Sequence, residues 1–191
     1  MGTCIYNQIH IIQSIPEHSE QTGTSLFNLL QQFRRTARPN LDVQLHNIQN
    51  REEWDNAVSQ LRRNQQEFYP IIHIEMHGNN RGLQLENGEF ISWAGFNEQM
   101  RSIKDLSQNN LLITMAVCKG ACLNNSIIGT LPYKVLIATE DNIIENRIYD
   151  SFATLYERIL KHVDVKEAVR QMNQTYNNPL TFKVYPEINN K

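Results

Sequence analysis

Two short motifs in this sequence carry side chains that could perform covalent chemistry. His77 and Gly78 end one apolar segment, and Cys118 ends a second one that continues into Lys119 and Gly120. A thiol beside an imidazole forms a nucleophile–base pair, in which the imidazole removes the thiol proton. Glycines close to each group allow backbone N–H groups to turn toward a reacting carbonyl oxygen. These residue types predict acyl transfer through a cysteine nucleophile.

The segments that lead into these motifs have the pattern of buried parallel strands. Residues 70–77 and 111–117 are short and mostly apolar, as is typical of strands that helices cover on both faces. Functional groups of open α/β sheets collect where loops leave the carboxyl ends of strands. We therefore expect the imidazole and the thiol at one edge of the sheet. A helix expected over residues 121–128 would place its positive end near Cys118 and favour the thiolate.

The rest of the chain alternates between apolar strands and amphipathic helices. Further strands are expected over residues 4–15, 41–48, 133–138 and 181–185, and a hairpin over residues 82–93 with its turn at Asn87-Gly88. One helix is expected to start at a cap at Thr24-Ser25, a second to start at Asn50, and a third to include Phe96, Met100 and Ile103. Two more are expected over residues 148–160 and 165–172. This order predicts an α/β sandwich whose largely parallel sheet of about six strands lies between helices.

Composition and charge narrow the range of functions. The 191 residues suit a single domain over residues 1–191. With 18 Lys and Arg against 20 Asp and Glu, the net charge of −2 offers no basic surface to nucleic acid or to an acidic membrane. No apolar run is long enough to cross a bilayer, and residues 1–12 show no secretory signal. Three sparse cysteines do not form a disulfide framework, so a cytoplasmic protein is expected.

Together, the motifs in residues 71–78, 82–92 and 111–118 resemble the CHAT branch of the caspase-like cysteine proteases. In that family a strand ends in His-Gly, a hairpin and a helix follow, and a hydrophobic strand ends in Cys. Residues 116–120 are similar to the caspase run Gln-Ala-Cys-Arg-Gly, with Ala116 in the place of its Gln. His77 and Cys118 are 118 − 77 = 41 residues apart, against roughly 50 in caspases.

The resemblance implies a caspase-like three-layer sandwich with a small hairpin after the His-Gly strand. It implies Cys118 as the nucleophile, His77 as the general acid and base, and the N–H groups of Gly78 and Cys118 as the oxyanion hole. Such a cysteine endopeptidase cleaves a protein substrate and requires no cofactor and no metal. Stand-alone bacterial members of the family resemble effectors of antiviral defence or cell death. Control by a partner chain or a homo-oligomer is expected.

Acidic residues after the next strand bear on substrate preference. Glu140 and Asp141 follow residues 133–138, at the edge where caspase-like folds build part of the substrate pocket. Carboxylates at that edge would prefer arginine or lysine before the scissile bond by charge complementarity. The other interpretation of this pair is an ordinary solvated loop.

Other interpretations of the same residues stay open. His73, Glu75 and His77 alternate along one strand and share a face, as three zinc ligands would. Cys118 fits a small core residue as well as a nucleophile, and Cys122 fits a packing residue or a regulatory thiol. The alternative function is a catalytically inactive scaffold or binding subunit with the same fold. A flavodoxin-like ligand binder is disfavoured, because no glycine-rich phosphate loop follows the first strand.

Overall fold

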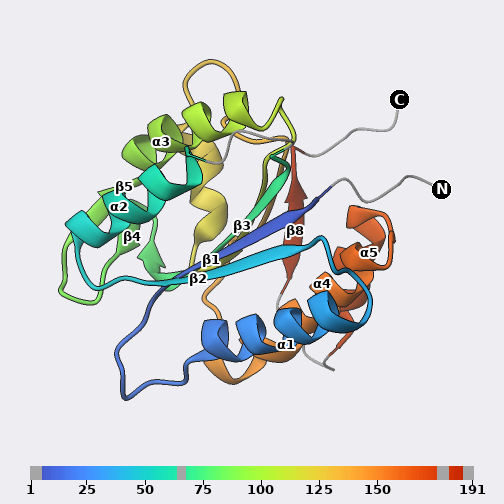
Figure 1. The fold of residues 1–191 in the computed structure, drawn as a ribbon. Helices are drawn as coiled ribbons and strands as arrows, with labels where there is room; N and C mark the ends of the chain where they lie inside the picture. Colours follow the sequence, from blue (N-terminus) through green and yellow to red (C-terminus); the bar gives the residue numbers. More distant parts are fainter. Residues whose placement is uncertain (1–5, 64–67, 176–180, 187–191) are drawn as a thin grey trace.

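A mostly parallel sheet forms the centre of the computed structural model, which describes residues 6–63, 68–175 and 181–186. Its six main strands have the order β2-β1-β3-β6-β7-β8 (Figure 1). They are β1 (Gln8–Ser14), β2 (Asp42–Asn47), β3 (Pro70–Asn79), β6 (Leu112–Ala116), β7 (Val135–Thr139) and β8 (Phe182–Tyr185). Neighbouring strands are parallel except for β7 and β8. The largely parallel sheet of about six strands is confirmed.

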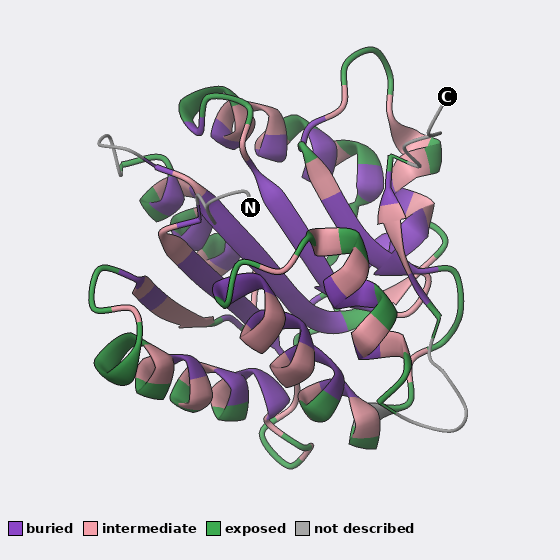
Figure 2. Ribbon diagram, turned by 90° about the vertical axis from the view of Figure 1, so that its right-hand side faces the viewer, coloured by how far each residue is buried: buried purple, intermediate pink, exposed green. Residues whose placement is uncertain are grey.

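Helices cover both faces of this sheet and make three layers (Figure 1). One face carries α1 (Thr22–Thr36), α4 (Ile148–Leu160) and α5 (Val165–Asn173). The other carries α2 (Arg51–Leu61), α3 (Trp93–Leu106) and the 3-10 helix η1 (Gly120–Ser126). A short 3-10 turn, η2 (Glu145–Arg147), leads into α4. Figure 2 shows the buried strands between helices that expose only their outer sides, so each face has its own apolar core.

Side-chain caps fix the starts of three helices. Asn50 accepts a hydrogen bond from Glu53 N at 3.0 Å and starts α2, as expected. Ser92 accepts from Gly95 N at 3.2 Å and starts α3, and Asp164 accepts from Lys166 N at 2.9 Å before α5. Each cap satisfies one of the amide groups that a helix leaves without an internal partner. None of the helices in the described ranges is both long and apolar enough to span a membrane.

The expected hairpin is present and lengthens the strand that carries His77. β4 (Gly82–Gln84) and β5 (Phe90–Ser92) are antiparallel, and β4 also pairs with the end of β3. The prediction that this strand ends after His77 is therefore wrong by two residues. Gly78 pairs with Leu83, and this pairing carries β3 on to Asn79.

Two predicted helix starts differ from the structure. Helix α1 begins at Thr22 and not after a cap at Thr24, because Thr24 N donates to Gln13 Oε1 on β1 at 3.1 Å. A tertiary contact thus supplies the acceptor that a local cap would supply. The α-helix expected over residues 121–128 is instead the seven-residue 3-10 helix η1, which follows Lys119 in the left-handed conformation (φ 59°). Cys4 lies outside the described residues.

Candidate active site

The sheet register brings His77 and Cys118 to the same place. Ile71 pairs with Leu112 in the parallel ladder of β3 and β6, an offset of 41 residues. His77 and Cys118 are also 118 − 77 = 41 residues apart, so the register, continued past the end of β6, places them side by side. The expected meeting of these two strand ends is confirmed. The spacing of His77 and Cys118 in the sequence therefore equals the register offset of the two neighbouring strands.

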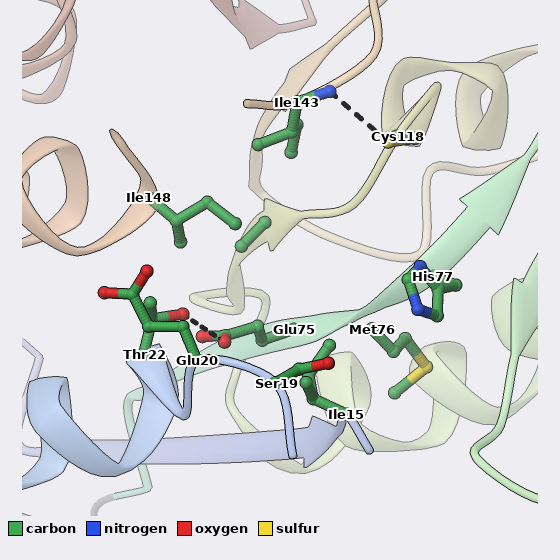
Figure 3. Close-up of a pocket in the computed structure, with 11 residues that line it drawn as sticks. Ile15, Ser19, Glu20, Thr22, Glu75, Met76, His77, Cys118, Ile143 and Ile148 are labelled. Carbon is green, nitrogen blue, oxygen red and sulfur yellow. Dashed lines mark hydrogen bonds between the residues drawn. The ribbon is translucent and has the colours of Figure 1, made fainter. Parts of the chain in front are cut away.

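Both side chains border one pocket on the face of the sheet that carries α1 and α4 (Figure 3). Alternate residues of a strand share a face, and Glu75, two residues before His77, contacts Thr22 at the start of α1. The pocket lies between the ends of β3 and β6, the loop from β1 to α1, and the start of α4. Its remaining lining residues are Ile15, Ser19, Glu20, Thr22, Glu75, Met76, Ala116, Ile143 and Ile148.

The Cys118 thiol is half-buried and contacts a backbone amide. Its Sγ accepts a hydrogen bond from Ile143 N at 3.3 Å. Ile143 belongs to the segment after β7, and its side chain packs against the core beneath α1 and α4. Ile143 carries no signal in the sequence, because no local pattern reports a contact between positions 25 residues apart.

The His77 ring is exposed at the mouth of the pocket. Among the described residues, no hydrogen bond joins this ring to the Cys118 thiol, although both groups border the same space. Catalytic hydrogen bonds are often long in the absence of substrate and shorten in the complex. The arrangement therefore allows the thiol and the imidazole to contact the same molecule in the pocket.

Gly78 allows the two strand ends to approach closely. A Cβ atom at this position would lie 2.3 Å from Val117 Cγ1 and 3.1 Å from the carbonyl oxygen of Cys118. Only a residue without a side chain fits such an approach. The backbones of Gly78 and Cys118 therefore lie near each other, as a shared oxyanion hole requires. That role of their N–H groups stays a prediction.

A polar network is buried on the same face, behind the pocket. Nδ1 of the fully buried His73 lies 2.9 Å from Thr114 Oγ1 and 3.2 Å from Tyr156 Oη. Nε2 of His73 lies 3.6 Å from Glu75 Oε2, and Glu75 Oε1 accepts a hydrogen bond from the Thr22 hydroxyl. Burial raises the pKa of the Tyr156 hydroxyl above its usual value, so this group remains a proton donor. The network ties β3 to β6, α1 and α4.

His73, Glu75 and His77 share a face of β3, as predicted, but their surroundings differ. His73 is enclosed by Thr114 and Tyr156, whereas His77 is exposed at the pocket. Within the described ranges, no group of three or more His, Cys, Asp or Glu side chains is placed to hold a metal ion. The contacts of His73 identify it as a structural histidine.

Glu140 and Asp141 are not among the residues that line this pocket. Glu140 instead accepts hydrogen bonds from Lys183 Nζ at 3.1 Å and Tyr185 Oη at 3.0 Å on β8. The hydrogen bonds from Lys183 and Tyr185 hold the pKa of the Glu140 carboxyl below its usual value. Asp141 contributes its backbone, whose oxygen accepts a hydrogen bond from Lys119 N at 3.0 Å.

The pocket is nevertheless acidic, through two other carboxylates. Glu20 lies in the loop before α1, and Glu75 lies on β3. Glu75 is 1% exposed, and its Oε2 lies 3.6 Å from Nε2 of the buried His73. Glu75 lies two residues before His77, and alternate residues of a strand share a face. This alternation, visible in the sequence, is the signal that could have identified Glu75 as a pocket residue.

Comparison with solved structures identifies the fold. A secreted C11 cysteine protease from Bacteroides thetaiotaomicron, in complex with an irreversible peptide inhibitor, matches 90% of this chain with a TM-score of 0.57 and 8% identity. The complex of Porphyromonas gingivalis RgpB pro- and mature domains matches 93% with a TM-score of 0.55 and 10% identity. The chain spans 57% and 47% of those two chains.

At such low identity these similarities show the fold alone. They confirm the caspase-like α/β fold, with its central sheet between two layers of helices. No protein-family model matches the sequence, and no curated protein matches it either.

Proposed function

We propose that this protein is a cysteine endopeptidase of the caspase-like class, with Cys118 as the nucleophile and His77 as the general acid and base. The shared register of β3 and β6 carries the proposal, because it sets a thiol beside an imidazole at the ends of adjacent strands. Both groups border one pocket, and the surrounding fold is caspase-like. The contacts of Gly78 support the same assignment.

The reaction proceeds through a covalent acyl-enzyme. His77 takes the thiol proton, and the Cys118 thiolate attacks the carbonyl carbon of the scissile peptide bond. The N–H groups of Gly78 and Cys118 stabilise the resulting oxyanion, and one such donor contributes about 3 kcal/mol. The imidazolium returns its proton to the leaving amine as the C–N bond breaks. Water, deprotonated by His77, then hydrolyses the thioester and releases the new carboxylate.

The proposal includes a preference for arginine or lysine before the scissile bond. Glu75 supports it in place of Glu140 and Asp141, because its carboxyl group lines the pocket. A guanidinium or ammonium group that enters the pocket would be attracted to this group by charge complementarity. Glu20 adds a second negative charge to the lining.

The finer assignments rest on the sequence motifs. The His-Gly strand, the hairpin and the hydrophobic strand that ends in Cys118 support the CHAT branch within the caspase-like class. By analogy with that branch, we propose a cytoplasmic effector of bacterial antiviral defence or cell death. A partner chain or a second copy would then control its activity.

The experiment that tests this proposal is cleavage of a fluorogenic peptide library with Arg, Lys, Asp or Leu before the scissile bond. The wild type should cleave Arg and Lys peptides best, Cys118→Ala should be inactive, and Glu75→Gln should lose the preference for the basic peptides. Cys122→Ala is the matched control and should remain active. Wild-type turnover by Cys118→Ala would exclude the proposed nucleophile. No turnover by the wild type, with slow and His77-independent alkylation of Cys118, would identify an inactive scaffold.

A further inference from the structure

The segment that follows β7, residues 140–147, contacts the nucleophile directly. Ile143 N donates to Cys118 Sγ at 3.3 Å, a short distance for a hydrogen bond to sulfur. Figure 3 shows the Ile143 amide and the His77 ring on different sides of the thiol. In this view the amide does not lie between the thiol and the imidazole.

Several contacts fix this amide in place. Asp141 N donates to Thr139 Oγ1 at 3.1 Å, which shapes the turn at the end of β7. Lys119 N donates to Asp141 O at 3.0 Å and ties this segment to the residue after the nucleophile. The Ile143 side chain packs against the core beneath α1 and α4. The N–H of Ile143 is thus held toward the sulfur by its surroundings.

The local structure after Cys118 supplies little stabilisation to a thiolate, so a hydrogen-bond donor from another segment matters more. The sequence predicted an α-helix whose positive end would stabilise the charge, but η1 is a seven-residue 3-10 helix. Such a short helix offers little of the aligned dipole of a long α-helix. The N–H of Lys119 is also unavailable, because it donates to Asp141 O. A hydrogen bond donated to the charged form of an acid favours that form.

We propose that the backbone N–H of Ile143 stabilises the Cys118 thiolate, so that Ile143 is a positioning residue for the nucleophile. This inference rests on the proposed function and deepens it. His77 accepts the thiol proton, and the Ile143 amide holds the negative charge on Sγ until the sulfur bonds to the carbonyl carbon. The side chain of Ile143 packs against the core and so holds the amide in place.

Alkylation of Cys118 by iodoacetamide tests the inference without a peptide substrate. The thiolate displaces iodide from the reagent, so the rate at neutral pH reports the thiolate population. Ile143→Pro removes the amide hydrogen. We expect alkylation about tenfold slower, as the loss of one hydrogen bond to a charged group implies, with a matching fall in thiolate ultraviolet absorbance. Mass spectrometry of the Cys118 peptide separates this thiol from the other cysteines.

Two control variants separate the amide from the rest of the loop. Ile143→Val keeps the N–H and changes the side chain. Asn142→Pro places a proline one residue earlier and keeps the Ile143 N–H. Both should match the wild type in rate and in thiolate absorbance. A folded Ile143→Pro variant that alkylates as fast as Asn142→Pro, or faster, would overturn the inference.

A second pair of variants covers the case in which Ile143→Pro does not fold. Thr139→Ala removes the hydroxyl that accepts from Asp141 N, so it should loosen the turn and slow alkylation by up to about fivefold, since a typical hydrogen bond contributes about 1 kcal/mol. Thr139→Ser should restore the rate, and equal rates in both variants would overturn the inference. His77→Ala reports on the dyad separately. An unchanged rate in that variant would contradict the proposed function, while the comparison of Ile143→Pro with Asn142→Pro would still decide the role of the amide.

Discussion

His73 and His77 lie on the same face of β3, yet the two ends of this strand place them in opposite environments. His73 is fully buried, with its ring against Thr114 and Tyr156 and near Glu75. His77 is exposed and borders the pocket with Cys118. Residue type and alternation are the same for both histidines. Their position along the strand separates a histidine that is enclosed by other side chains from one that borders the pocket.

The largest expected effect is on catalysis at the open end of the strand. His77→Ala should lower kcat for the best peptide by about 10³-fold, the usual contribution of a general acid and base. Its free energy of unfolding should change by less than about 0.5 kcal/mol, because the side chain is exposed. Peptide kinetics and urea denaturation of the same preparation measure both quantities. A large loss of stability with intact turnover would reverse the roles assigned to the two histidines.

At the buried end, the expected effect is on stability. His73→Ala should lower the free energy of unfolding by about 3 kcal/mol, because it opens a cavity and removes the ring that contacts Thr114, Tyr156 and Glu75. Urea denaturation measures this change. His18→Ala is the matched control, since His18 is exposed and outside the pocket lining. Equal stability of the two variants would show that the buried network is not structural.

Two further histidines, His10 and His46, lie on the other face of the sheet and extend the comparison to the pH dependence of stability. The rings of His10 and His46 stack with centroids 5.7 Å apart. Burial, and then the proximity of His46, lowers the pKa of His10 to about 4, and burial lowers the pKa of His46, while Asp42 acts on His10 in the opposite direction. Both rings are therefore neutral in the folded protein and take up protons more readily in the unfolded chain.

Stability should then fall as the pH drops below about 6.5, the usual pKa of histidine, and the loss from His10 should continue to about pH 4. At pH 5 the loss from His10 should reach about 2 kcal/mol. Urea denaturation at pH 7 and pH 5 measures it, and His10→Gln should remove most of the difference. An equal pH dependence in that variant would assign the effect to other groups.

The smallest expected effect concerns Cys122, a thiol outside the pocket lining. Cys122, four residues after Cys118, packs against the core on the α2 and α3 face of the sheet. Cys122→Ser should cost about 1 kcal/mol of stability, because it places a hydroxyl in apolar surroundings, and should leave peptide turnover unchanged. Thermal denaturation and the peptide assay measure these two outcomes. Loss of turnover in this variant would point to a second reactive thiol.

Local patterns in the sequence were enough to predict most of the fold and the meeting of His77 and Cys118 at one edge of the sheet. Periodic apolar residues located α4 at residues 148–160 as the structure has it, and the helix start at Asn50 follows from side-chain chemistry within one helical turn. The site was predictable as far as His77 and Cys118 because both follow apolar strands. The sheet order then brought these strands together.

Tertiary contacts decided what the sequence did not predict. Gln13 on β1 sets the start of α1, and Lys183 and Tyr185 on β8 engage Glu140. The donor to Cys118 comes from Ile143, 25 residues later in the chain. Each of these contacts joins segments whose proximity depends on how the whole sheet is assembled. No local propensity encodes them.

The parallel register of β3 and β6 aligns His77 with Cys118, and this alignment does not depend on how many residues lie between the two strands. Extra residues in the exposed turn at Asn87-Gly88 would lengthen the chain between His77 and Cys118 without moving either strand. One residue inserted within β3 before His77 would turn the imidazole to the opposite face of the sheet. A search for relatives that fixes the histidine–cysteine spacing would therefore miss proteins with longer hairpins. A search that fixes the two strand patterns and leaves their spacing open would find them.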